Sequence, residues 1–162
     1  MIGFGIITVS DGVFAEKRVD LSGPVLKNLI EENGWETIQT SVIPDEEAII
    51  SETLYSYSQV PGLDIILTTG GTGFTKRDVT PEATKKVIEK EATPLAQIML
   101  LETYRINPKS VLSRGTAGIL NQKLIINLPG SPKGAVENLK VILSLLPHAV
   151  DLLRGESTTH QV

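Results

Sequence analysis

The stretch LDIILTTGGTGFTKRD, residues 63 to 78, decides the fold. Its first half is short, apolar and rich in β-branched residues, which is typical of a strand that is buried on both faces. Glycine and threonine follow at once in Gly70-Gly-Thr-Gly73, where a regular strand is not expected to continue. The sequence therefore predicts a buried strand over residues 63–69 that opens into a glycine-rich loop.

Two strand-and-helix pairs precede this stretch. The apolar run of residues 3–10 ends at a turn and predicts a strand, and residues 35–42 predict a second one. Apolar residues recur at helical spacing in 21–33, which Gly34 closes, and again in 45–57. This alternation favours an α/β fold with parallel strands and helices on both faces.

The rest of the chain continues with helices and short strands. We expect a helix from Thr80-Pro81, with the threonine as N-cap, to about Glu91, a helix over 94–106, two short strands at the sheet's edge over 117–120 and 123–128, and one long helix from Pro132 to Leu153. One domain over residues 1–155 and a loose tail over 156–162 are predicted.

Composition excludes several kinds of protein. There are 15 Lys and Arg against 19 Asp and Glu, so the net charge of -4 argues against nucleic acid as a partner. The chain contains no cysteine, which excludes disulfides and thiolate chemistry. No apolar run is long enough for a membrane span, and residues 2–9 lack the basic start of a secretory signal, so a cytoplasmic location is expected.

Three loops with unusual chemistry follow predicted strands, over residues 10–12, 68–78 and 128–133. Ligands of open parallel sheets bind beyond the carboxyl ends of the strands, where neighbouring loops diverge. We therefore expect these three loops to form one crevice.

The glycine loop suits an anionic ligand. Glycines let backbone N–H groups approach a phosphate closely, and the threonine hydroxyls add donors. Its pattern is neither a P-loop nor a dinucleotide fingerprint, and a flexible connection is the alternative. Ser131 precedes a helix whose positive end also attracts anions, although the same residues are ordinary at a helix start. Ser22-Gly23 has the same two interpretations.

Two acids lie in loops of this region, Asp45 and Asp78. Carboxylates beside bound phosphates commonly hold Mg²⁺, which shares its other positions with phosphate oxygens and water. The alternatives are that Asp45 caps the following helix and that Asp78 is a turn residue bonded to the backbone near Thr80.

Taken in order, six motifs resemble the molybdopterin adenylyltransferases, including the G domains of gephyrin and its plant counterpart. They are TVSDG (8–12), DLSGP (20–24), IPDEE (43–47), TTGGTGFTKRDVTPEA (68–83), LSRGTAG (112–118) and NLPGSPKG (127–134). The resemblance runs from Ile6 to about Gly155. It implies a three-layer α/β fold, a mostly parallel sheet flanked by helices, and a homotrimer.

The resemblance also implies a reaction, in which the terminal phosphate of molybdopterin attacks the α-phosphate of Mg-ATP and pyrophosphate leaves. Asp45 and Asp78 would hold Mg²⁺ and position the reacting phosphates. The enzyme that later inserts molybdate is an implied partner. The residues implied in substrate and nucleotide binding are Ser10, Asp11, Ser22, Gly23, Thr69, Gly70, Gly71, Thr72, Gly73, Ser113, Gly118, Pro129, Gly130 and Ser131.

The chain departs from many bacterial members at Gln97 and Leu100, where those members carry Glu and Arg. A role for that acid–base pair is therefore not implied here. Two other functions remain open: a non-catalytic molybdopterin-binding or scaffold paralogue of the same fold, and a related hydrolase domain of nucleotide salvage. The motifs RDVTPEA and PGSPK favour the catalytic branch.

Overall fold

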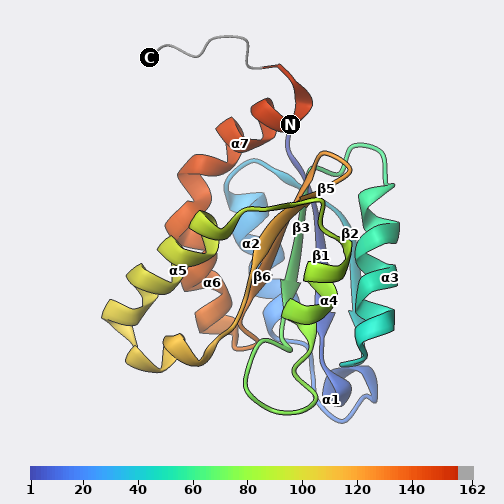
Figure 1. Ribbon diagram of the computed structural model, residues 1–162, viewed down its shortest axis with the longest axis vertical. Coiled ribbons are helices and arrows are strands. Elements are labelled where there is room, and N and C mark those ends of the chain that lie inside the picture. Colours follow the sequence, from blue (N-terminus) through green and yellow to red (C-terminus); the bar gives the residue numbers. More distant parts are fainter. Residues whose placement is uncertain (157–162) are drawn as a thin grey trace.

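The computed structural model describes residues 1–156 (Figure 1). The strands are β1 Gly3–Val9, β2 Glu36–Ile43, β3 Ile65–Thr69, β4 Lys90–Glu91, β5 Ala117–Leu120 and β6 Lys123–Leu128. The helices are α1 Asp11–Phe14, α2 Ser22–Glu32, α3 Glu47–Ser58, α4 Thr80–Val87, α5 Thr93–Ile106, α6 Pro132–Ile142 and α7 Leu146–Arg154, with 3-10 turns at Pro108–Leu112 and Leu143–Leu145. From residue 157 on, the predicted tail lies outside the described residues.

The strands form one six-stranded sheet in the order β2-β1-β3-β6-β5-β4. The first four strands run parallel, whereas β5 and β4 are antiparallel to their neighbours. The predicted α/β fold with a mostly parallel sheet is confirmed. The position expected for the two short strands is corrected in part: β6 pairs with β3 inside the sheet, and β4 lies outside β5.

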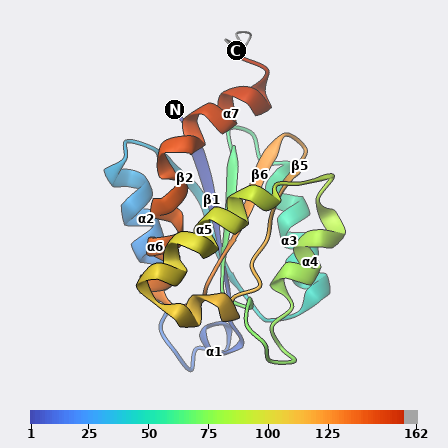
Figure 2. The same ribbon diagram turned by 60° about the vertical axis from the view of Figure 1, so that its left-hand side comes forward.

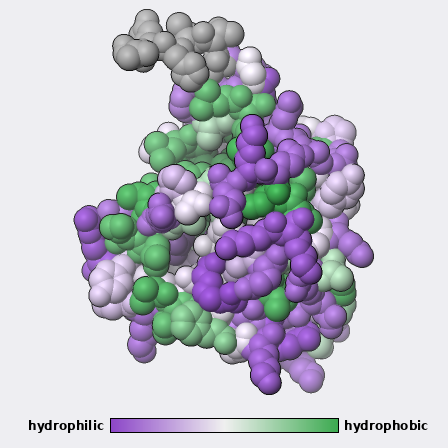
Figure 3. Space-filling model, viewed as in Figure 1, coloured by the Kyte–Doolittle hydropathy of each residue, from purple (hydrophilic) through white to green (hydrophobic). Residues whose placement is uncertain are grey.

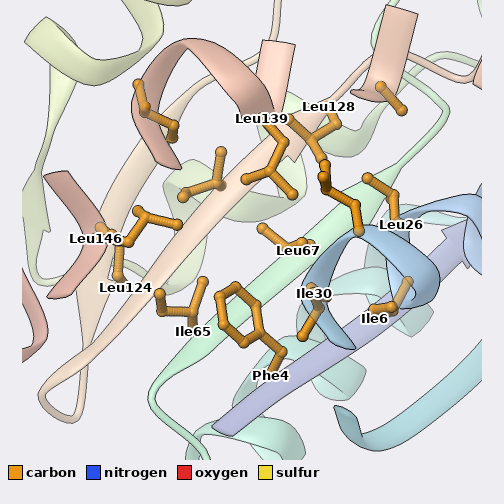
Figure 4. Close-up of a cluster of buried hydrophobic side chains, with 14 of the residues drawn as sticks. Phe4, Ile6, Leu26, Ile30, Ile65, Leu67, Leu124, Leu128, Leu139 and Leu146 are labelled. Atoms are coloured by element: carbon orange, nitrogen blue, oxygen red, sulfur yellow. The ribbon is translucent and has the colours of Figure 1, made fainter. Parts of the chain in front are cut away.

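Helices cover both faces of the sheet (Figures 1 and 2). One face packs against α2, α5, α6 and α7, and the other against α3 and α4. On the first face Phe4, Ile65 and Leu67 meet Leu26 and Leu139 in a buried hydrophobic cluster (Figure 4). Full burial of each such side chain contributes about 1.5–3 kcal/mol, so the two layers hold the sheet rigid behind its loops.

The helix predicted over residues 80–91 is shorter in the structure and ends at Val87. The backbone of Ile88 is extended, and the Glu89 N–H donates to the Ile119 carbonyl at 2.8 Å. Lys90 and Glu91 then pair with β5, where Gly118 leaves room for the Ile88 side chain. The partner strand therefore takes these residues out of the helix.

The single long helix predicted from Pro132 is also wrong, because the structure divides it into α6, a 3-10 turn and α7. Pro147 lies in the first turn of α7. It has no N–H to donate to the preceding turn, and its ring clashes with that turn, so one continuous helix is disfavoured there.

An ion pair fastens α7 at the amino ends of the strands. Arg154 donates to both carboxylate oxygens of Asp64, at 2.9 and 2.8 Å, and to the Met1 carbonyl at 3.0 Å. Asp64 also accepts the Gly3 N–H at 2.9 Å. This contact lies at the opposite end of β1 from its carboxyl-terminal loop. Among the residues described, no helix is both long and apolar enough to cross a membrane.

Candidate functional site

The loops that follow β1, β3 and β6 meet backbone to backbone. The Gly70 N–H donates to the Leu128 carbonyl at 3.1 Å, and Gly70 has a positive φ of 102°. A Cβ on Gly70 would lie 2.2 Å from the Val9 carbonyl oxygen, and one on Gly130 would lie 3.2 Å from the Gly70 Cα. Only glycine allows this approach at Gly70. The three loops therefore lie side by side, as predicted for one shared crevice.

Two adjoining cavities open at this edge of the sheet, with volumes of about 500 and 360 Å³. Gly71, Asp78, Gly130 and Ser131 line both of them. The larger cavity is further lined by Thr8, Val9, Ser10, Val13, Arg18, Val19, Asp20, Leu21, Ser22, Asp45, Thr69, Gly70 and Pro132. The smaller one is further lined by Thr72, Gly73, Thr103, Asn107, Lys109, Ser110, Leu112, Ser113, Pro129, Gly134, Glu137 and Asn138. The arrangement suits two ligands that meet at the shared residues.

Thr80 holds the glycine loop in shape. Its hydroxyl donates to the Gly70 carbonyl at 2.9 Å, and its N–H donates to the Gly71 carbonyl at 3.0 Å. The prediction that Thr80 is the N-cap of its helix is corrected, because Val79 occupies that position. The threonine side chain is used by the loop and not by the helix end.

Arg114 braces the other end of the same loop. Its N–H donates to the Thr72 carbonyl at 2.8 Å, and its guanidinium donates to the carbonyls of Gly73 at 2.7 Å and Asp78 at 2.8 Å. The guanidinium also pairs with Glu82, and this hydrogen bond lowers the pKa of the Glu82 carboxyl. Residues 72–82 are thereby tied to the start of β5.

Asp45 and Asp78 both line the larger cavity. Oδ2 of Asp45 accepts the Asp11 N–H at 2.8 Å, and Oδ2 of Asp78 accepts the Thr75 N–H at 2.9 Å. Oδ1 of Asp45 faces Gly71, since it lies 3.0 Å from where a Cβ of that glycine would be. Glu46 and not Asp45 is the N-cap of α3, so the capping alternative does not explain Asp45.

Burial raises the pKa of the Asp45 carboxyl, and the negative charges of Asp11 and Asp78 raise it further. A bound cation would relieve this repulsion. In the described part of the chain, no three His, Cys, Asp or Glu side chains gather as a metal site. Two hard carboxylates fit Mg²⁺ only where phosphate oxygens and water complete its shell.

Hydroxyl groups predicted to bind substrate also join the loops. Ser22 donates to the Gly130 carbonyl at 2.7 Å, and Thr69 donates to the Pro129 carbonyl at 2.8 Å. Ser131 is the N-cap of α6, where its Oγ accepts the Gly134 N–H at 3.2 Å. These side chains line the cavities while their hydrogen bonds shape the walls.

Three predicted binding residues do not line either cavity: Asp11, Gly23 and Gly118. The Asp11 carboxylate is bound by Arg77, at 2.9 and 3.0 Å. The Gly23 N–H donates to Asp20 Oδ1 at 3.0 Å. Gly118 lies in β5 beneath Ile88, so its small size serves packing.

Sequence reasoning missed several polar residues of the smaller cavity, among them Asn107, Lys109, Glu137 and Asn138. Glu137 and Asn138 lie on α6, Lys109 lies in the 3-10 turn and Asn107 directly precedes that turn, where polar residues are ordinary, so no signal in the sequence marked them. Asn127 was also missed, although it is the one polar residue within the apolar run LIINL. Its side chain is buried and bonded to Thr116, Thr68 and Thr84.

Together, the fold and crevice define an α/β domain with a two-part ligand site at the carboxyl edge of its sheet. Residues 5–148 match the model of a family described as "probable molybdopterin binding domain". The chain therefore belongs to the family of molybdopterin-binding domains of molybdenum cofactor biosynthesis, which includes adenylyltransferases and is related to gephyrin.

Individual relatives agree with this family. The molybdenum cofactor synthesis protein cinnamon of Drosophila melanogaster is 45% identical over 94% of this chain, which spans 26% of that protein's length. A molybdopterin adenylyltransferase of Helicobacter pylori is 36% identical, with 95% of this chain and 89% of that protein covered. The solved molybdopterin biosynthesis enzyme MoaB of Thermus thermophilus is 42% identical, with 96% and 98% covered and a TM-score of 0.90.

Proposed function

We propose that this protein transfers the adenylyl group of ATP to the terminal phosphate of molybdopterin, giving adenylylated molybdopterin and pyrophosphate. The observation that carries the proposal is the pair of adjoining cavities that share Asp78 and the glycine loop. A group transfer between two bound substrates needs two sites whose ends meet. The Helicobacter pylori relative, which carries the name of this activity, supports the assignment across 89% of its length.

In this proposal Asp45 and Asp78 would hold Mg²⁺ through carboxylate oxygens that no other group in the described part of the chain occupies. The Oδ1 atoms of both acids accept no hydrogen bond from the residues described, whereas each Oδ2 is fixed by a backbone N–H. Mg²⁺, when bound, neutralises charge on the reacting phosphates. Removal of either acid should therefore weaken the reaction without unfolding the protein.

The remaining chemistry is positioning. The glycine loop presents backbone N–H groups to phosphate oxygens, and the N-terminus of α6 beyond Ser131 adds a positive dipole end. The attacking phosphate of molybdopterin is itself the nucleophile, so no side chain has to become one. In-line placement of the two phosphates and stabilisation of their charge supply the rate enhancement.

A non-catalytic molybdopterin-binding protein is the second candidate. It stays open because the MoaB protein of Thermus thermophilus, at 42% identity, is as similar to this chain as the adenylyltransferases are, so similarity alone does not select the adenylylating branch. Gln97 and Leu100, the positions of departure from many bacterial members, line a further cavity of about 400 Å³ beside Arg114. The proposed reaction assigns these two residues no role.

Assembly as a homotrimer in the cytoplasm is part of the proposal. Hydrophobic surface gathers over the side of the molecule where α5 and the following 3-10 turn lie (Figure 3). The exposed apolar residues of this surface are Ile98, Leu101, Tyr104, Ile106, Val111 and Leu112. Apolar surface of this kind supports contact with another chain. Light scattering coupled to gel filtration should give three times the mass of 17.5 kDa.

The deciding experiment measures pyrophosphate release from ATP and Mg²⁺ with and without purified molybdopterin. We expect release that depends on molybdopterin and that falls at least about 100-fold in Asp78→Asn. Thermal unfolding of the variant controls for its fold. If the parent protein binds molybdopterin but releases no pyrophosphate, the binding or scaffold function replaces the enzyme.

A further inference from the structure

One arginine connects the loops of three neighbouring strands. Arg77, in the loop after β3, donates from Nε to Asp11 Oδ2 at 2.9 Å and from Nη2 to Asp11 Oδ1 at 3.0 Å. Nη2 also lies 3.5 Å from Glu46 Oε1. Asp11 follows β1 and Glu46 follows β2, so the guanidinium spans the carboxyl ends of β3, β1 and β2. Its planar fork suits this two-point grip on a carboxylate.

Asp11 in turn holds Asp45 through two hydrogen bonds. The Asp45 N–H donates to Asp11 Oδ1 at 3.0 Å, and in return the Asp11 N–H donates to Asp45 Oδ2 at 2.8 Å. This reciprocal pair fixes both the backbone and the carboxylate of Asp45. With Oδ2 held, Oδ1 faces Gly71 and the larger cavity.

The same contacts argue against Arg77 as a phosphate ligand. Neither Arg77 nor Asp11 lines either cavity. Nε and Nη2 of Arg77 are occupied by carboxylates, and the Arg77 hydrogen bond lowers the pKa of the Asp11 carboxyl. The guanidinium of Arg77 and the carboxylate of Asp11 thus neutralise each other at the rim of the site.

We propose that Arg77 is a positioning residue, which grips Asp11 and thereby holds the Asp45 carboxylate toward Gly71 and Asp78. Its catalytic consequence rests on the proposed function, whereas the positioning itself does not. Arg77 directly precedes Asp78, so one contact also sets the distance between the loops that carry the two acids. Asp11, predicted as a binding residue, acts in this arrangement as the link.

Backbone hydrogen exchange tests the positioning without any reaction. The Asp45 N–H should exchange roughly tenfold faster in Arg77→Ala, because it donates to the Asp11 carboxylate that Arg77 grips. The Asp11 N–H should follow, because its acceptor Asp45 is held in place by that bond. Arg77→Lys keeps the positive charge but loses the two-point grip on Asp11, and it should give a smaller effect. Arg105→Ala is the matched control, since Arg105 makes a similar exposed pair with Glu102 away from the site. Unchanged exchange at both amides overturns the proposal.

Metal binding tests the consequence for Asp45. Mn²⁺ titrated in the presence of ATP, without molybdopterin, and followed by electron paramagnetic resonance should bind roughly tenfold more weakly to Arg77→Ala. The double variant Arg77→Ala/Asp11→Asn should bind Mn²⁺ no more weakly than the weaker single variant, because the two residues act as one unit. Additive losses would show that Arg77 contacts the nucleotide or metal directly and would overturn the inference.

The rate of pyrophosphate release distinguishes positioning by Arg77 from direct contact with the substrate. In the pyrophosphate assay, Arg77→Ala should need roughly tenfold more Mg²⁺ for half-maximal rate, while the KM for ATP at saturating Mg²⁺ stays within about twofold. A raised KM with unchanged Mg²⁺ dependence would contradict positioning. If the parent protein releases no pyrophosphate, the proposed function fails, while the exchange and Mn²⁺ results still decide the role of Arg77.

Discussion

Replacing Asn127 with leucine should destabilise the protein without removing volume. The Asn127 side chain is 3% exposed and makes three hydrogen bonds. Its Oδ1 accepts the Thr116 N–H at 3.1 Å, and its Nδ2 donates to the hydroxyls of Thr68 at 3.0 Å and Thr84 at 2.9 Å. Leucine fills the same space but satisfies none of these partners.

The magnitude follows from what each partner loses. The buried N–H of Thr116 is left unsatisfied, at a cost of about 1–3 kcal/mol. The Thr84 hydroxyl still donates to the Thr80 carbonyl at 2.8 Å and loses only an accepted bond. Adding about 0.5–1.5 kcal/mol for each of the two hydroxyls gives a total of roughly 2–6 kcal/mol. For a chain of this length, each 1 kcal/mol lowers Tm by roughly 2–4 °C.

Urea unfolding and calorimetry measure this loss. Thr84→Val is the matched control, because it removes one partner of Asn127 while conserving volume, and it should cost less than Asn127→Leu. The double variant should cost less than the sum of the two, since both remove the same bond. A loss below about 1 kcal/mol in Asn127→Leu, or additive losses, would refute the network as the source of stability.

Three further perturbations have definite signs. Asp45→Asn should lower the rate of pyrophosphate release at least about 100-fold. It should also raise Tm at neutral pH, because folding raises the pKa of this carboxyl and its charged form therefore opposes folding. The gain in Tm should vanish in acid, below the ordinary carboxyl pKa of 3.8. Arg154→Ala should cost about 1–3 kcal/mol in urea unfolding and leave kcat unchanged, because Asp64 loses its partner far from the crevice. Gly70→Ala should cost at least about 1–3 kcal/mol and reduce pyrophosphate release, because the new Cβ meets the Val9 carbonyl; equal stability would contradict the close packing of these loops.

The periodicity of the sequence was sufficient to predict the alternation of strands and helices from β1 to β3, the strands β5 and β6, and the meeting of three loops. Each of these depends on local patterns and on the shared direction of parallel strands. The end of α4 could not be predicted locally, because the Glu89 N–H is satisfied by Ile119, thirty positions away along the chain. The break at Pro147 was not predicted, because the apolar spacing continues on both sides of it and favours one helix.

Some parts of the candidate site could likewise be predicted from the sequence, and others could not. The glycine loop and the two acids could be named as candidates because they follow predicted strands, but the residues alone left a helix cap and a turn open as alternatives for the acids. The role of Arg77 was not predictable, since its partner Asp11 lies 66 positions earlier and only the fold brings them together. The same holds for Thr80, whose place beside a proline indicated a helix cap until its hydroxyl was seen to hold the Gly70 carbonyl.

The contact of Arg154 with Met1 and Asp64 lies at the end of the molecule opposite the ligand crevice. The first residue and the last turn of α7 are joined at one pole, while the loops that line the crevice lie at the other (Figure 1). An affinity tag or a reporter protein fused before Met1 should therefore leave both cavities accessible to small ligands. The protein could be immobilised through that pole for surface-based binding measurements with its crevice facing the solution.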